Sequence, residues 1–176
     1  MFPIKINSMK ILETERMFLR RFIENDIERL SEIYSDEEVM RYIGRGGILN
    51  KEQTKKGIDT WINKIYDELG FGIWALIDKE SDLLIGHCGF NKLPQNDGVE
   101  IAYLLAKDFW RKGLATEISQ ETLKFGFEKL NLGRIVALAY PQNIPSINII
   151  KKLGMKPKGE KIFFERKFRF FVIDKS

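Results

Sequence analysis

One segment of the chain combines residue types that can bind an anion and move a proton. It runs from Glu100 to Glu117 and reads EIAYLLAKDFWRKGLATE. An apolar run, which predicts a buried strand, leads from a carboxylate into a basic loop with one glycine. The loop then opens a long helix with an apolar face. This order is compatible with chemistry on a compound that carries phosphate groups.

The predicted start of that helix has the features of a pyrophosphate site. The first turn of a helix presents unpaired N–H groups and a partial positive charge. Gly113 has no side chain, so the backbone can approach an anion closely there. Arg111 and Lys112 add positive charge, and Thr116 adds a hydroxyl. Taken alone, such a loop is more often a surface turn, and it matches neither a P-loop nor a dinucleotide fingerprint.

The loop resembles that of the GNAT superfamily of acetyltransferases, which place a Gln/Arg-x-x-Gly-x-Gly/Ala sequence between a strand and the CoA-binding helix. The six positions here run from Trp110 to Ala115, and the Gly-x-Ala half matches. Trp110 departs from the general pattern but is similar to the branch that includes the Rim ribosomal-protein N-terminal acetyltransferases. Arg111 stands where that branch often has glycine, so its side chain must point away from the phosphates or clasp them.

Three further segments resemble that branch, in the branch's own order. Thr14–Arg20 (TERMFLR) resembles its opening Thr-Glu-Arg-Leu-x-Leu-Arg strand, and Glu100–Tyr103 (EIAY) resembles its Glu-Ile-Gly-Tyr strand. Asn143–Ser146 followed by Lys152–Met155 resembles its Asn-x-x-Ser … Lys-x-Gly-Phe helix. The resemblance covers most of the chain. It implies an N-acetyltransferase with a splayed central sheet, acetyl-CoA as co-substrate in the gap, and no metal.

The resemblance also implies roles for individual residues. Glu100 is expected to take the proton from the acceptor amine through water, and Ser146 is expected to lie near the thiol. Backbone groups of the strand end and the side chain of Asn143 are expected to hold the pantetheine arm. The cofactor-binding set is Leu104, Leu105, Ala106, Arg111, Lys112, Gly113, Leu114, Ala115, Thr116, Asn143 and Ser146. Each has a structural interpretation beside it: a core strand, a surface turn, a helix cap, or, for Glu100, a salt-bridge partner.

The acid that protonates the departing thiolate is not evident from the sequence. Many GNAT enzymes place a tyrosine seven residues after the asparagine, but Ile150 stands there and cannot serve. A CoA thiolate is not very basic, so a water or Ser146 would suffice. Tyr103 is expected to face the opposite side of its strand from Glu100. His87 is the only histidine and is expected to be structural, although alternation leaves open that it faces the acceptor cleft.

The elements that position these residues follow from periodicity and turn signals. Strands are predicted at Met9–Phe22, Phe71–Ile77, Leu83–Leu93, Val99–Leu105, Arg134–Tyr140, Met155–Gly159 and Ile162–Ile173. Helices are predicted after Asn25, after Ser35, from Asn50 to Leu69, from Gly113 to Leu130 and from Ser146 to Leu153. This order predicts an α/β (α+β) fold, with a GNAT-like mixed, largely antiparallel central sheet flanked by helices. Residues 1–176 are expected to form a single acetyltransferase domain.

Composition excludes several classes of protein. The 176 residues are 44% hydrophobic and 31% charged, which indicates a globular domain. The single cysteine excludes an internal disulfide framework, and its apolar surroundings predict that Cys88 is buried. With no signal-like start and no apolar run of about 18 residues, no membrane association and a cytoplasmic location are expected. The net charge of +4 is interleaved along the chain, which disfavours nucleic acid as a partner.

The acceptor stays open at this level. A protein N-terminus is the first hypothesis, by analogy with the branch alone. A small amine such as a polyamine, an amino sugar or an amino acid is the alternative, as is a CoA-binding module without turnover. A homodimer is also left open.

Overall fold

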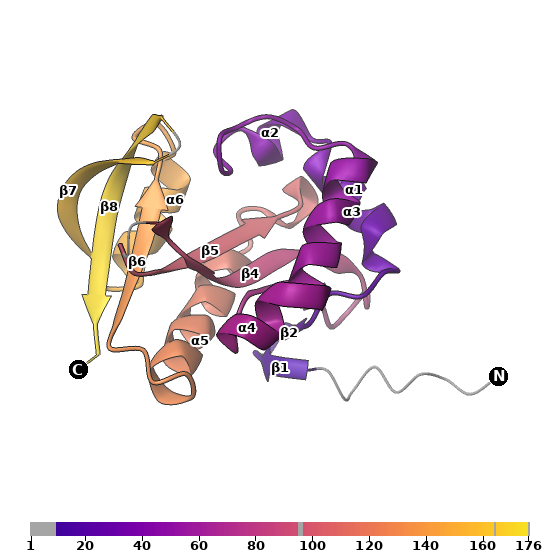
Figure 1. Ribbon diagram of the computed structural model, residues 1–176, viewed down its shortest axis with the longest axis horizontal. Helices are drawn as coiled ribbons and strands as arrows, with labels where there is room; N and C mark the ends of the chain where they lie inside the picture. The colour runs from indigo at the N-terminus through magenta and orange to yellow at the C-terminus, as the bar shows by residue number, and fades with distance from the viewer. Residues whose placement is uncertain (1–9, 95–96, 164, 176) are drawn as a thin grey trace.

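An eight-stranded sheet runs through the computed structural model, which describes residues 10–94, 97–163 and 165–175 (Figure 1). Its strands lie in the order β1-β2-β3-β4-β5-β6-β8-β7. They are β1 (Lys10–Glu13), β2 (Met17–Arg20), β3 (Ile73–Asp78), β4 (Leu84–Lys92), β5 (Val99–Leu105), β6 (Arg134–Ala139), β7 (Lys156–Phe163) and β8 (Arg166–Asp174). Every neighbouring pair is antiparallel except β5 and β6. The predicted fold class is therefore confirmed.

The parallel pair β5–β6 holds together at one point only. Glu100 lies opposite Val136, and this is the single register position that the two strands share. Beyond it the strands diverge, and β6 rises toward α6 while β5 runs across the sheet (Figure 1). The sheet is thus splayed in the middle, and the gap opens toward the C-terminal ends of both strands.

Helices cover both faces of the sheet. One face carries α1 (Asp26–Tyr34), α2 (Glu37–Met40), α3 (Lys51–Thr60), the π-helical segment η2 (Trp61–Ile65) and α4 (Tyr66–Leu69). The other face carries α5 (Leu114–Glu128) and α6 (Ile144–Lys152), while the 3₁₀ turn η4 (Lys107–Phe109) follows β5. Side chains cap two of these helices: Asp36 accepts from two first-turn amides of α2, and Asn50 forms a capping box with Gln53. Asn25, at the N-cap of α1, makes no side-chain capping hydrogen bond.

Alternation along β5 and β6 separates the residues of the site between the two faces. Tyr103 packs against the large core cluster beneath α5, together with Ala137 of β6. Leu104 packs against the cluster beneath α1 and α3. Because side chains alternate, Glu100 shares the face of Leu104, and its partner Val136 lies on that face of β6. The expectation that Glu100 and Tyr103 face opposite sides agrees with these contacts.

The N-terminal strand prediction was wrong. A single strand was expected from Met9, which lies outside the described residues, to Phe22. The structure instead turns between β1 and β2, where Thr14 exchanges hydrogen bonds with Met17 through its hydroxyl and its amide. The charged centre of the segment is therefore a hairpin turn.

The other corrections concern the C-terminal third. Helix α6 begins at Ile144 rather than Ser146, because Asn143 caps it and accepts from the amide of Ser146 at 3.2 Å. Gly159 was expected to end a strand. It lies inside β7, where φ is +92° and the pairing with β8 shifts between Pro157 and Glu160. A glycine in such a strand marks a bulge, so the hairpin turn comes later, between Phe163 and Arg166.

Two further features concern burial and length. Cys88 is fully buried as predicted, and burial raises the pKa of its thiol to about 11. Within the described part of the chain, none of the helices is long and apolar enough to cross a bilayer.

Candidate active site

The loop before α5 presents its backbone outward. Gly113 occupies the N-cap position with φ +78°, and no described side chain caps the first turn of the helix. Among the residues of that turn, Leu114 points into the core, while Ala115 and Thr116 are half-buried. The first-turn amides therefore have no side-chain acceptor among the described residues. Together with the helix dipole, they form a surface suited to phosphate oxygens.

Arg111 explains why glycine is common at its position in the resembling branch. Its φ is +60°, a left-handed conformation that glycine adopts without strain and that costs a residue with a Cβ about 1 kcal/mol or more. The side chains of Arg111 and Lys112 are exposed, and the Lys112 ammonium lies 5.0 Å from the centre of the Phe109 ring. Both positive charges thus flank the loop.

Arg16 fixes the loop from the β1–β2 turn. Its guanidinium pairs with the Glu117 carboxylate, with Nε and Nη2 lying 2.7 Å and 2.6 Å from Oε2. Its Nη1 donates to the carbonyl of Lys112 at 2.9 Å. This contact turns the Lys112 carbonyl away from the outward amides, so Arg16 holds the loop in the conformation that presents N–H groups.

Near the end of β5, the backbone N–H and C=O groups of every second residue point toward the gap. The amide of Ala106 donates to the carbonyl of Ile85 in the sheet, at 2.7 Å. Because backbone groups alternate in direction along a strand, those of Leu104 also point toward β4, and those of Tyr103 and Leu105 point toward the gap. The indole N–H of Trp110 donates to the Leu105 carbonyl at 2.8 Å. The tryptophan of the loop therefore anchors the loop to the strand end.

Glu100 lies at the vertex of the splay. Asn91 is its cross-strand neighbour on β4. Burial raises the pKa of Glu100 to about 7, and a hydrogen bond from the Asn91 side chain partly offsets that rise. A carboxylate with a pKa near neutrality can accept a proton at physiological pH and release it again. Glu100 therefore has the properties of a general base.

Tyr103 and Ser146 meet on the opposite face. The Tyr103 hydroxyl lies 2.9 Å from Ser146 Oγ, and burial raises the pKa of Tyr103 above its ordinary value. Ser146 lies in the first turn of α6. The side-chain amide oxygen of Asn143 caps this helix. Ile150, in the position of the usual tyrosine, is buried in the core. The two hydroxyls thus form the polar pair that borders the gap on this side.

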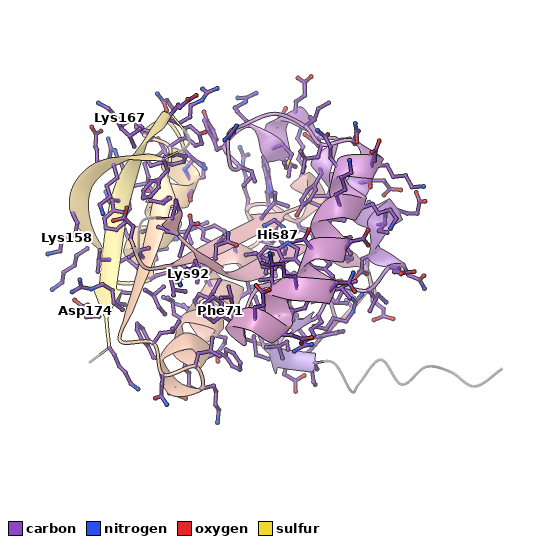
Figure 2. All side chains as sticks on the ribbon, in the orientation of Figure 1. Phe71, His87, Lys92, Lys158, Lys167 and Asp174 are labelled. Carbon is purple, nitrogen blue, oxygen red and sulfur yellow. The ribbon has the colours of Figure 1, made fainter. Side chains whose placement is uncertain are left out.

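His87 lies between the sheet and the helices of the first face (Figure 2). Its Nδ1 is 2.7 Å from the hydroxyl of Tyr34 on α1, and burial lowers the pKa of His87 to about 4. The side chain is 7% exposed. A buried neutral imidazole that is hydrogen-bonded to a helix supports the structural interpretation.

Sequence reasoning missed three contributors to this geometry. Arg16 belongs to the quoted TERMFLR segment, but its link to Glu117 spans 101 positions of sequence. Asn91 could have been paired with Glu100 only if the hairpin register of β4 and β5 had been worked out. Tyr103 was expected only to face away from Glu100, and its pairing with Ser146 was missed because Ser146 lies on a helix that is distant in sequence.

Comparison with known proteins gives the same picture. Residues 16–156 match the family model described as an acetyltransferase (GNAT) domain. An uncharacterized N-acetyltransferase, p20 of Bacillus licheniformis, is 37% identical over 152 residues, which cover 86% of this chain and 85% of that protein.

Two solved structures share the fold and contain coenzyme A. RimL, a ribosomal L7/L12 α-N-protein acetyltransferase in complex with coenzyme A, has a TM-score of 0.78 at 15% identity, covering 94% of this chain and 97% of that one. A spermidine N-acetyltransferase of Vibrio cholerae in complex with CoA and spermine has a TM-score of 0.76 at 17% identity, covering 92% and 96%. At these identities the likeness concerns the fold alone.

Proposed function

The chain belongs to the GNAT family of acetyltransferases, and from this premise we propose that it transfers the acetyl group of acetyl-CoA to the α-amino group at a protein N-terminus. The observation that carries the catalytic part is Glu100, a carboxylate with a pKa of about 7 at the vertex of the splay. A sheet that merely bound CoA would have no need for a tuned base at that point.

The residues around the gap fit acetyl-CoA. The outward amides of Gly113, Leu114, Ala115 and Thr116 would hold the pyrophosphate, with Arg111 and Lys112 beside them. The gap-facing backbone of Tyr103 and Leu105 would pair with the pantetheine amides, in the manner of an added strand. Leu104 and Ala106 would support that edge from within the sheet. The side-chain amide oxygen of Asn143 caps α6, so the side-chain NH₂ group of Asn143 would be left to donate to pantetheine.

Glu100 would accept the proton of the acceptor amine through a water. An α-amino group has a pKa of about 8, so much of the acceptor is protonated at neutral pH and cannot attack until it loses a proton. The neutral amine nitrogen then bonds to the thioester carbonyl carbon, the carbon–sulfur bond breaks, and the second proton of the nitrogen leaves to water as the amide forms. A carboxylate of pKa about 7 is a far better base than an ordinary glutamate at this step.

Ser146 would stabilise the departing sulfur. Its hydroxyl donates a hydrogen bond to the thiolate, and its partner Tyr103 supplies a hydroxyl through which a solvent proton can reach it. The electron pair of the broken bond stays on sulfur, which ends as the free thiol. This pair takes the place of the tyrosine that Ile150 replaces.

The choice of a protein N-terminus over a polyamine rests on the Rim-like segments and on the charge of the acceptor side, which is described below. A test is an acetyl-CoA-dependent assay of thiol release across peptide N-termini, polyamines, amino sugars and amino acids. We expect the highest kcat/KM for a peptide. Binding of acetyl-CoA with no turnover on any amine would indicate a binding module instead, and a thermal shift with acetyl-CoA would separate that outcome from a misfolded sample.

A further inference from the structure

The loop that follows α2 lies opposite the edge formed by β6 and β8 (Figure 1). A cavity of about 560 Å³ is lined by residues of both. Arginine side chains dominate its charged lining: Arg41 and Arg45 come from the loop, and Arg166 comes from the start of β8. Glu37 is the one carboxylate among the lining residues. Arg41 and Arg166 alone outnumber the one glutamate, so the lining carries an excess of positive charge in a space that is open to an incoming ligand.

Two of these arginines are available to a ligand. Arg41 and Arg166 are exposed, and neither pairs with a carboxylate in the described part of the chain. By contrast, arginines elsewhere form close pairs, such as Arg20 with Asp26 at 2.7 Å. An arginine fork that is not engaged within the protein is suited to a carboxylate, which it binds through two parallel hydrogen bonds.

Aromatic contacts hold the walls of the cavity together. The Tyr140 hydroxyl donates to the carbonyl of Gly44 at 2.8 Å, which joins the loop to the end of β6. The rings of Tyr42 and Tyr140 lie 5.7 Å apart, and the Tyr140 ring lies 4.4 Å from that of Phe168 on β8. The arginines are thus carried on segments whose relative positions these contacts fix.

The cavity opens on the same face of the sheet as Glu100. Val136 faces that side opposite Glu100, so by alternation Leu138 and Tyr140 follow on the same face. Phe168 contacts Tyr140 on this face, and Arg166 precedes Phe168 by two positions on β8. The four-residue step from Val136 to Tyr140 spans roughly 13 Å of strand. The carboxylate base and the arginines therefore mark two ends of one path, with half-buried Leu138 between them.

We propose that this cavity binds an acidic side chain of the acceptor peptide and so selects N-termini with aspartate or glutamate at the third or fourth residue. This inference rests on the proposed function, because it takes Glu100 as the site of the amine. An extended peptide advances about 3.3–3.6 Å per residue, so the fourth residue lies about 10–11 Å from an amine near Glu100. The lengths of the glutamate or aspartate side chain and of the arginine side chains span the rest of the path, which brings the third or fourth side chain within reach of Arg41 and Arg166.

The same geometry argues against the smaller acceptors. A free amino acid carries its carboxylate next to its amine and cannot reach both ends of the path. A polyamine would place a second positive charge among the arginines, where like charges repel. The cavity thus distinguishes an acidic peptide from both.

The test compares kcat/KM for hexapeptides that differ only in having glutamate, glutamine or lysine at position 3 or 4, with acetyl-CoA as donor. The order glutamate, glutamine, lysine is expected, with about a tenfold step between the first two at low salt. That preference should shrink as ionic strength rises. In Arg41→Gln and Arg166→Gln, the ratio of kcat/KM for the glutamate peptide to that for the glutamine peptide should fall about tenfold.

A matched control comes from the same hairpin. Lys167 follows Arg166 but lies on the opposite face of β8, where it points outward (Figure 2) and pairs with Glu160 at 3.2 Å. Lys167→Gln removes the same charge and should leave the preference ratio as in the wild type. A ratio that falls equally in Lys167→Gln would show a general charge effect and overturn the specific site.

Two outcomes separate this inference from the proposed function. Efficient acetylation of peptides with no preference for glutamate, or a higher kcat/KM for spermidine, would overturn the inference while leaving an N-acetyltransferase. If no amine is acetylated, calorimetry of the glutamate and glutamine peptides in the presence of CoA still tests the cavity. Equal affinity for both peptides, or no change in Arg166→Gln, would then overturn the inference on binding alone.

Discussion

The hydroxyl of Tyr103 on β5 lies 2.9 Å from the hydroxyl of Ser146 on α6, and the two side chains join the diverging arms of the sheet. Their positions are 43 residues apart in sequence. The pair places two hydroxyls on the face opposite Glu100, where a departing thiolate would need a hydrogen-bond donor.

Ser146→Ala and Tyr103→Phe should each lower kcat by about tenfold, within the lower range for acid catalysis on so weakly basic a leaving group. The Kd for acetyl-CoA should stay near the wild-type value. Because the two hydroxyls act together, the double variant should be scarcely slower than the worse single variant. Steady-state kinetics with calorimetry measures both, and fully additive losses would contradict a shared role.

Glu100→Gln should lower kcat/KM on the order of 10²-fold at pH 7 and recover partly at alkaline pH, where the free amine appears. The wild-type profile should rise through pH 7, since the raised pKa of Glu100 leaves it protonated in acid. In the Gln variant this rise should be missing, and only the rise from the amine should remain. An unchanged profile would exclude Glu100 as the base.

In Asn91→Val, the rise of kcat/KM with pH should occur at a higher pH than in the wild type. The Asn91 side chain lowers the pKa of Glu100 by hydrogen bonding to its carboxylate, against the larger effect of burial. Without that bond the protonated form gains relative stability, while valine suits the strand position. The measurement is kcat/KM against pH at saturating acetyl-CoA, and a shift to lower pH would contradict the assigned contact.

Glu100 should also make the fold less stable in alkali. Its folded pKa of about 7 exceeds the ordinary value of 4.5, so the protonated carboxyl is favoured in the native state. That contribution is fully present below about pH 4.5 and is lost as the pH rises through 7. Glu100→Gln should therefore be more stable than the wild type at pH 8, by at most about 3 kcal/mol, and nearly equal at pH 5. Chemical denaturation at both pH values tests the sign.

Gly113→Ala should weaken acetyl-CoA binding by tenfold or more. An added Cβ would project from the outward loop backbone, where the one described atom within 4 Å is Arg16 Nη2 at 3.6 Å, an ordinary contact distance. The protein therefore has room for the Cβ, whereas a pyrophosphate held against the loop amides would lose part of that room. The φ of +78° adds strain of about 1–2 kcal/mol. Gly70→Ala is the matched control, because Gly70 has φ +71° and no atom within 4 Å of an added Cβ. Equal loss of affinity in both variants would mean that strain alone is responsible.

The sequence predicted best what local signals determine. The bounds of β5 agree with the prediction because Gly98 and the charged pair after Ala106 delimit an apolar run. Asn50 caps its helix as predicted because the signal lies within three residues. The turn between β1 and β2 was missed because Thr14 makes it by side-chain hydrogen bonding within a charged segment that also suits a strand.

The same distinction between local signals and distant contacts applies to the candidate site. Gly113 and Glu100 lie in one contiguous segment that the sequence singles out. The partners that adjust them do not: Arg16 reaches the loop across 101 positions, and Arg166 faces Arg41 only once β8 lies beside β6. Such pairings follow from strand order and register, which periodicity does not reveal.

The single register position between β5 and β6 has a mechanical consequence. Two strands that are joined at one point can change their relative angle only about that point, which acts as a fulcrum and is displaced least. Glu100 and Val136 are that fulcrum, whereas Tyr103 and Ser146 are carried farther out on the arms. Any change in the angle between the two strands would therefore displace the two hydroxyls more than the base.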